Sequence, residues 1–304
     1  MELNENARID TSQVEDRRGG GGGLAGSGIP IPIPTGRGGI VGLIIAALVA
    51  LVGGGFGINA ATSGGGDQGD NAAIEQRCAA NDALQQLDCR NTLFVNSIQA
   101  YWQTALPQHF GERYQQADTV FFQQAVNTGC GAADSGVGPF YCPADRHVYI
   151  DLGFYQVLAQ QLGARGEFAQ PYVLAHEYGH HVQTLLGTEA QMRRQQQRDP
   201  GNANRLSVML ELQADCYAGA WARNATGTAD AGGQKIFKSI SAADIREGLD
   251  TAAAIGDDTI QRKSGGQINE SKFTHGSSAQ RQQWFNQGYE SGDPKSCDTF
   301  NGQV

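Results

Sequence analysis

The sequence of 304 residues lacks the motifs of several large enzyme classes, and positive charge is scarce in it. It has no Gly-x-Ser-x-Gly nucleophile motif, no phosphate-binding P-loop and no dinucleotide-binding glycine fingerprint, so none of these marks an active site. Its 22 lysines and arginines stand against 31 acidic residues, for a net charge of −9, and they form no basic cluster. Because nucleic acid is bound by clustered basic surfaces, we expect no nucleic-acid partner.

Charge is absent from one long segment. Residues 38–58 (GGIVGLIIAALVALVGGGFGI) carry no charged side chain, and a helix of about 20 residues matches the hydrocarbon thickness of a bilayer. We therefore predict a transmembrane helix over residues 38–58. A buried core helix and a cleaved signal peptide are the alternatives, but the high glycine content and the long segment before the span argue against them.

The charges beside this span predict its orientation. Arg17, Arg18 and Arg37 precede it, and the first basic residue after it is Arg77. Positively charged flanks stay in the cytoplasm, so we expect a single-pass cell-membrane protein with a cytoplasmic N-terminus. The rest of the chain would then lie in the periplasm or at the cell exterior.

All six cysteines follow the predicted span, and none forms a Cys-x-x-Cys metal-binding pair. An even number on one side suits disulfides in an oxidising compartment, which agrees with the predicted orientation. Pairing sequence neighbours suggests Cys78 with Cys89, Cys130 with Cys142, and Cys216 with Cys297, although six cysteines allow fifteen pairings.

Glycine content divides the chain, because 19 of the 42 glycines fall in the first 70 residues. Residues 1–37 mix charges of both signs with five consecutive glycines and an Ile-Pro repeat, and we expect a disordered Gly/Pro-rich cytoplasmic leader there. The span over 38–58 and a linker over 59–72 would follow. Residues 73–304 form the remaining domain, in which no internal repeat is visible.

This domain shows more helical than strand periodicity. Apolar residues recur at helical spacing in residues 91–106 and 153–162, whereas residues 146–151 alternate polar and apolar side chains as a short strand does. We expect a mainly helical α+β domain with a small sheet.

Two histidines one helical turn apart mark the first half of a metal site. The segment PYVLAHEYGHHVQTLL predicts a helix that Pro171 can start and Gly187 can end. Within it, His176 and His180 lie on one face, where both imidazoles can bind the same Zn²⁺. Glu177 beside them is suited to act as general base toward a metal-activated water.

A second predicted helix, LSVMLELQADCYAGAW, supplies carboxylates. Glu211 and Asp215 share one of its faces among apolar neighbours, and burying them unpaired would be costly. A solvated helix face is the alternative. We expect Glu211 to complete a His₂Glu zinc site, and Asp215 to accept the other ring N–H of a ligand histidine.

These residues give the sequence a family resemblance. HEYGHHVQ at 176–183, ELQADCYAG at 211–219 and the tail from His275 to Phe300 resemble the gluzincin metallopeptidases, and more closely the bacterial "putative neutral zinc metallopeptidases". The resemblance covers about 240 residues and implies a zincin-like fold and a peptide or protein substrate. The Gln- and Arg-rich connection from Thr188 to Arg205 is longer than in thermolysin-like members.

The resemblance also gives His275 a candidate role. Gluzincins use a downstream histidine to stabilise the developing oxyanion, and His275 is the only histidine after the two metal helices. The alternative is a loop histidine that packs locally. His181 faces away from the metal and is more often a supporting or surface residue, while Tyr149 fits a substrate groove or the core equally well.

The sequence thus predicts a zinc-dependent, HExxH-type metalloendopeptidase that acts outside the cytoplasm. The alternative from another class is a catalytically silent, zinc-stabilised scaffold or binding protein of the cell envelope. The retained Glu177 favours catalysis, because a purely structural site has no use for a base beside it.

Overall fold

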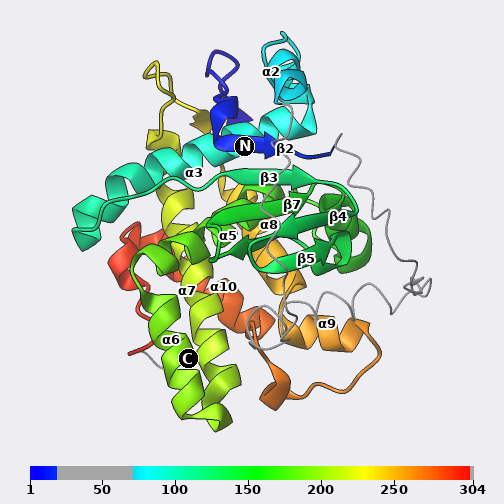
Figure 1. Cartoon of the computed structure of the whole chain (residues 1–304), viewed down its shortest axis with the longest axis vertical. Coiled ribbons are helices and arrows are strands. Elements are labelled where there is room, and N and C mark those ends of the chain that lie inside the picture. The colour runs from blue at the N-terminus through cyan, green and yellow to red at the C-terminus, as the bar shows by residue number, and fades with distance from the viewer. Residues whose placement is uncertain (19–70, 302–304) are drawn as a thin grey trace.

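A four-stranded mixed sheet lies at the centre of the structure, a computed structural model that describes residues 1–18 and 71–301 (Figure 1). The strand order is β2-β3-β7-β6. Strands β2, β3 and β7 run parallel, and β6 pairs antiparallel with β7 at one edge. Their bounds are Val14–Asp16 for β2, Thr119–Phe122 for β3, Phe140–Cys142 for β6 and His147–Asp151 for β7.

Each face of the sheet has its own apolar cover. Phe121, Val148 and Ile150 point to the side where the helices pack and belong to the main core. Their neighbours Val120 and Tyr149 point to the opposite side and join a smaller cluster, because successive side chains of a strand alternate between faces. A hairpin of β4 (Ala125–Thr128) and β5 (Gly131–Asp134) covers that second face.

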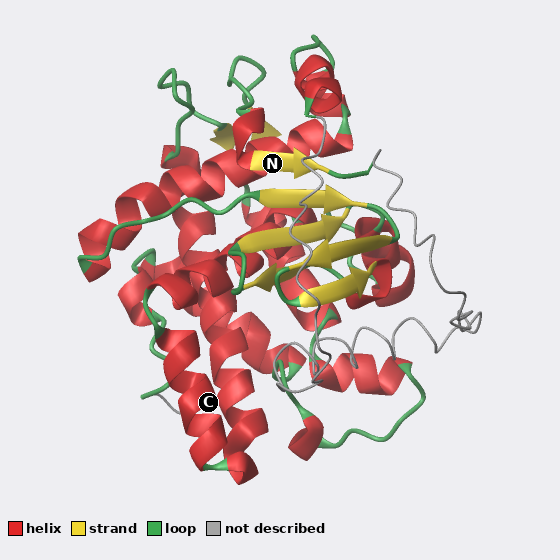
Figure 2. Cartoon of the chain, in the orientation of Figure 1, coloured by secondary structure: helices red, strands yellow, loops and turns green. Residues whose placement is uncertain are grey.

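Helices make up most of the domain, as Figure 2 shows, so the expected α+β class is confirmed. The predicted helices over 91–106 and 153–162 and the strand over 146–151 all appear within a few residues of their expected bounds. The helices are α2 (Ala72–Cys78), α3 (Leu87–Phe110), α4 (Phe154–Val157), α5 (Ala169–Leu185), α6 (Thr188–Arg198), α7 (Ala203–Asn224), α8 (Ala242–Ala254), α9 (Asp257–Lys263) and α10 (Ser278–Ser291). A π-helical turn (Leu158–Leu162) extends α4, and β1 (Glu2–Leu3) pairs with β8 (Phe237–Ser239).

Glycines bring three of these helices into close contact. A Cβ added to Gly179 of α5 would lie 2.9 Å from the Cα of Ala214 in α7. Where α7 meets α10, a Cβ on Gly219 would lie 2.0 Å from the carbonyl oxygen of Phe285, and one on Gly288 would lie 1.9 Å from that of Cys216. Only glycine allows backbones to approach this closely, so these positions fix how near α5 and α10 lie to α7.

Residues 1–18 are part of this domain, which corrects the expected disordered leader for that stretch. The side chain of Asn96 in α3 accepts the Asp10 N–H and donates to the Asp10 carbonyl, both at 2.9 Å. The side chain of Asn71 likewise accepts the Asp16 N–H at 3.0 Å and donates to the Val14 carbonyl at 2.9 Å, which holds β2.

Four charged side chains also hold β2 in place. Arg18 contacts Asp16 at 2.7 Å and Asp88 at 2.6 Å, and Arg77 contacts the same two carboxylates at 3.0 and 2.8 Å. The prediction of disorder failed here because it used local composition, whereas the partners of this segment in α3 and around α2 lie 55 to 86 residues away. The remainder of the leader, the predicted span over 38–58 and the linker up to residue 70 lie outside the described residues.

Within residues 1–18 and 71–301, no helix combines the length and apolar character that a membrane crossing requires. The disulfides are Cys78–Cys89, Cys130–Cys142 and Cys216–Cys297, which confirms the pairing of sequence neighbours. All six cysteines are paired.

Candidate metal centre

Helices α5 and α7 bring two histidines and one carboxylate together. His176 and His180 lie one turn apart on α5, with ring centroids 4.9 Å apart and ring planes nearly perpendicular. Glu211 on α7 faces both rings: its Oε2 lies 3.2 Å from His176 Nε2, and its Oε1 lies 3.5 Å from His180 Nε2. These donor atoms all lie within 4.8 Å of one another.

The spacing of these atoms fits a zinc ion. Ligands about 2.0–2.1 Å from a tetrahedral Zn²⁺ lie about 3.3 Å from one another. Glu211 places one oxygen near each histidine at close to that distance, 3.2 Å from His176 Nε2 and 3.5 Å from His180 Nε2, and one donor atom from each residue lies within 4.8 Å of the others. Two neutral imidazole nitrogens and one carboxylate also form a donor set that zinc prefers in catalytic sites, with a fourth position left for water.

The electrostatics of the three side chains also favour a cation. Burial alone would raise the pKa of Glu211, but the nearby His180 and His275 hold it well below its usual value. Burial would likewise lower the pKa of His176, yet the Asp215 and Glu211 carboxylates raise it to about 10. The protein therefore stabilises positive charge between these groups, as a metal site requires.

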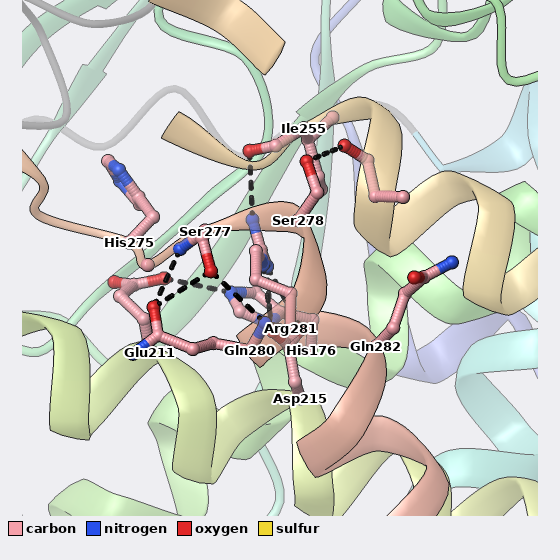
Figure 3. Close-up of polar contacts among 12 residues, drawn as sticks. His176, Glu211, Asp215, Ile255, His275, Ser277, Ser278, Gln280, Arg281 and Gln282 are labelled. Atoms are coloured by element: carbon pink, nitrogen blue, oxygen red, sulfur yellow. Dashed lines mark hydrogen bonds and ion pairs between the residues drawn. The ribbon is translucent and has the colours of Figure 1, made fainter. Parts of the chain in front are cut away.

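Asp215 reaches His176 from α7, as the helical spacing predicts. Its Oδ1 lies 2.8 Å from His176 Nδ1 and accepts the Tyr172 hydroxyl at 2.6 Å. Arg281 from α10 donates to the same carboxylate, from Nε at 2.7 Å and from Nη2 at 2.9 Å (Figure 3). Burial alone would raise the pKa of Asp215, but Arg281 and His176 lower it to about 2, so the carboxylate is ionised.

Glu177 lies in α5 directly after His176 and is 8% exposed. Burial raises the pKa of its carboxyl, an effect that the neighbouring His176 and His180 partly oppose. A carboxylate with a raised pKa accepts a proton more readily, which is the property required of a general base.

His275 lies on the loop before α10, on the same side of the site as Glu211 (Figure 3). One carboxylate shapes this loop: Asp257 Oδ2 accepts the N–H groups of Thr274, His275 and Gly276 at 2.7, 2.7 and 3.0 Å. The other oxygen of Asp257 lies 3.2 Å from His275 Nδ1. His275 Nε2 is buried and finds no hydrogen-bond partner among the residues that the structure describes.

Two residues whose roles the sequence left open support the fold. His181 is fully buried; its Nε2–H donates to the Gln115 carbonyl at 2.6 Å, and its Nδ1 accepts the Tyr141 hydroxyl at 3.1 Å. Tyr149 lies in β7, between two other strands, and stacks on Phe140 at 5.0 Å. It is a core tyrosine and does not line an open strand edge.

Sequence reasoning gave no role to Arg281, Asp257 or Gln183, although all three touch site residues. Arg281 and Asp257 are buried charges, 3% and 5% exposed, but their neighbours in sequence are mostly polar, so no local signal reveals their burial. Gln183 follows His180 by three residues, so it lies on the same helix face as that histidine.

Comparisons with known proteins agree with this geometry. The chain matches the family described as "Putative neutral zinc metallopeptidase" over residues 3–300. It is 40% identical to the uncharacterized protein YpfJ of Escherichia coli (strain K12) over 301 residues, which is 98% of each chain. It is 47% identical to the uncharacterized protein Rv2575 of Mycobacterium tuberculosis over 222 residues, 72% of this chain and 73% of the relative. No solved structure matches the chain.

Proposed function

This chain belongs to the putative neutral zinc metallopeptidase family, and on that premise we propose that it is a zincin-like endopeptidase that hydrolyses peptide bonds by metal-activated water. The family implies Zn²⁺ as the cofactor. The arrangement that carries the proposal is the open His176, His180 and Glu211 set with Glu177 next to it in α5. A structural zinc site is closed by four protein ligands, whereas a catalytic one keeps a position free.

Each residue has one task in this mechanism. When bound, Zn²⁺ supplies Lewis acidity that lowers the pKa of water and polarises the substrate carbonyl. His176, His180 and Glu211 would hold the ion. Glu177 accepts the proton of the attacking water and later passes it to the leaving amine, and the burial that raises its carboxyl pKa makes it a better proton acceptor.

His275 supplies a donor for the oxyanion in this proposal. Two arrangements leave a hydrogen on its Nε2: a ring protonated on both nitrogens beside Asp257, or a neutral ring whose Nδ1 accepts the Thr274 hydroxyl at 3.0 Å. Its Nε2 is a buried polar atom that has no hydrogen-bond partner among the described residues. Leaving such an atom unpaired is costly unless a ligand satisfies it, which supports a role toward substrate in either arrangement that places a hydrogen on Nε2.

Strand β6 offers a place for the peptide backbone. It is the antiparallel edge strand of the sheet, and Tyr141 in β6 donates to His181, the residue after ligand His180. This hydrogen bond ties the strand edge to the metal helix. A peptide that added to β6 as a further strand would have its backbone held by main-chain hydrogen bonds beside the metal ligands.

We further propose that the domain acts outside the cytoplasm, because three disulfides persist only in an oxidising compartment. The predicted anchor over 38–58 remains a prediction. Residues 1–18 pack against the domain, so they must lie on the same side of a membrane as the domain while these contacts hold. A cytoplasmic N-terminus with an extracytoplasmic domain is therefore one arrangement, and both on the same side is the other. A reporter that is active only outside the cytoplasm, fused ahead of Met1, distinguishes the two arrangements: activity there excludes the predicted cytoplasmic N-terminus.

The test of peptidase activity uses the full-length chain, because a fragment starting at Asp70 would lack β1 and β2. A library of quenched fluorescent peptides should be cleaved, and a zinc chelator should abolish cleavage until zinc is restored. Glu177→Gln should keep about one zinc per chain and lose at least about 10²–10⁴-fold in rate, because the water loses its base. Cleavage that survives this substitution would place the base elsewhere. A zinc-loaded chain that cleaves no peptide would favour the scaffold alternative.

A further inference from the structure

The two histidines of the metal centre have unlike partners on their second ring nitrogens. His176 Nδ1 meets the Asp215 carboxylate, whereas His180 Nδ1 lies 2.9 Å from the amide oxygen of Gln183. A neutral imidazole must carry its hydrogen on one nitrogen to leave a lone pair on the other. The partner of Nδ1 therefore decides whether Nε2, which faces Glu211, is free to bind a metal.

A backbone carbonyl fixes the direction of the Gln183 amide. Gln183 Nε2 lies 2.7 Å from the carbonyl oxygen of Leu210, and a carbonyl can only accept a hydrogen bond. The amide nitrogen must therefore point to Leu210, which turns the amide oxygen toward His180. It follows that His180 donates from Nδ1 and keeps the Nε2 lone pair for the metal.

Gln213 of α7 repeats this arrangement one step further from the metal. Its Nε2 donates to the carbonyl oxygen of Cys297 at 2.9 Å, so its own oxygen faces Gln183 Nε2, at 3.1 Å. Both glutamine side chains are buried, at 0% and 7% exposure, so water does not compete for these bonds. The chain of hydrogen bonds has one direction, from His180 through two amides to the C-terminal tail.

The tail that ends this chain is itself held on α7. Cys297 forms a disulfide with Cys216, and Thr299 donates to the Met209 carbonyl at 2.6 Å. We propose that Gln183 and Gln213 are positioning residues that fix the tautomer of His180. The Leu210 carbonyl directs Gln183, and the Cys297 carbonyl of the C-terminal tail directs Gln213, which reinforces that direction. The proposal rests on the metal site of the proposed function and not on peptide cleavage.

The test compares matched glutamine-to-methionine variants of the full-length chain. Methionine keeps the length of the side chain but neither donates nor accepts like an amide. Gln183→Met should weaken zinc binding about 10–100-fold, because this is the usual effect of losing the hydrogen-bond partner of a ligand histidine. Competition with a chromophoric chelator measures the zinc affinity. Gln213→Met should give a smaller loss, about 3–10-fold, because the Leu210 carbonyl still orients Gln183.

Gln196→Met in α6 is the control. Gln196 also donates to a backbone carbonyl, that of Ala203 at 2.9 Å, but touches no site residue. Zinc affinity should be unchanged in this variant. A loss equal to that of Gln183→Met would mean that any amide bonded to a backbone carbonyl matters, and it would overturn the proposal.

A direct reading of the tautomer makes the test independent of activity. The ¹⁵N spectra are recorded on protein from which a chelator has removed zinc, with the His180 ring neutral. In the native protein His180 should carry its hydrogen on Nδ1. In Gln183→Met the two tautomers should mix. If Gln183→Met does not fold, the same spectra of Gln213→Met decide. Native affinity and an unmixed His180 tautomer in the folded variants would overturn the proposal, whether or not the native chain cleaves peptides.

The role of the tail has its own pair of variants. Replacing both Cys216 and Cys297 with serine should lower zinc affinity and weaken the tautomer preference of His180 about as much as Gln213→Met does. The Cys297 carbonyl then no longer directs Gln213, while the Leu210 carbonyl still directs Gln183. Replacing both Cys130 and Cys142, a disulfide that holds the hairpin to the sheet, should leave both measurements unchanged. Equal effects in the two double variants would remove the tail from the proposal.

Discussion

Neutralising Asp215 should damage the protein in two separable ways. This carboxylate is fully buried and meets three partners at once: His176, Tyr172 and Arg281. In Asp215→Asn, the amide nitrogen must replace one of the two oxygens. If it takes the place of Oδ2, the oxygen that remains still accepts from His176, Tyr172 and Arg281 Nη2, but the amide N–H groups face Arg281 Nε and the arginine loses its anionic partner.

The size of each effect follows from these contacts. Arg281 is 3% exposed, and a buried charge that loses its partner costs about 3–5 kcal/mol of folding free energy. The hydrogen bond from His176 to a neutral amide is weaker than to a carboxylate, so zinc affinity should fall about 10–100-fold. The variant should therefore be both less stable and poorer in zinc.

A double variant separates the two effects. Asp215→Asn with Arg281→Met removes the stranded charge, so most of the lost stability should return in urea unfolding, while zinc affinity stays 10–100-fold low because His176 still lacks its anion. Unfolding is measured with a chelator present, so that lost zinc does not count as lost stability. If Asp215→Asn alone lowers the free energy of unfolding by less than about 1 kcal/mol, the buried ion pair is not a stabilising contact.

Three further predictions test other parts of the structure. His275→Ala should lower kcat about 10²–10³-fold in the peptide assay with zinc content unchanged, because an oxyanion donor acts mainly in the transition state; loss of zinc would show a supporting role instead. Burial lowers the pKa of His181 from 6.5 to about 4. Between pH 6.5 and 4, His181 is therefore protonated in the unfolded state but neutral in the folded state. Stability should then fall by up to about 3 kcal/mol as pH drops from 6.5 to 4, and His181→Gln should flatten this part of the unfolding curve. Gly288→Ala should cost about 1–3 kcal/mol or more in urea unfolding, because its Cβ would overlap the Cys216 carbonyl; an unchanged midpoint would mean that α10 can move away from α7.

The metal helices could be predicted from the sequence because their signals are local. His176 and His180 are four residues apart, as are Glu211 and Asp215, and helical geometry alone places each pair on one face. The disulfides followed from sequence neighbours for the same reason in two cases, where the partners lie 11 and 12 positions apart.

The supporting contacts could not be predicted, because they join distant parts of the chain. Arg281 lies 66 residues after Asp215, and Cys297 lies 84 residues after Gln213. Periodicity within a helix says which face is buried, but not which residue of another helix meets it. Strand β2 was missed for a related reason: a three-residue strand has almost no periodic signal, and its partners lie far along the chain.

The unequal support of the two histidines has a consequence for the charge of the centre. Glu211 is the one anionic ligand, and the charge of Asp215 is balanced by Arg281 in direct contact. With Zn²⁺ bound, zinc, Glu211, Asp215 and Arg281 sum to +1, not counting the Glu177 carboxylate that serves as base. A carboxylate in place of Gln183 beside His180 would reduce this sum to zero. The neutral amide fixes the same tautomer of its histidine and adds no negative charge beside the ion, which favours polarisation of a carbonyl and ionisation of water.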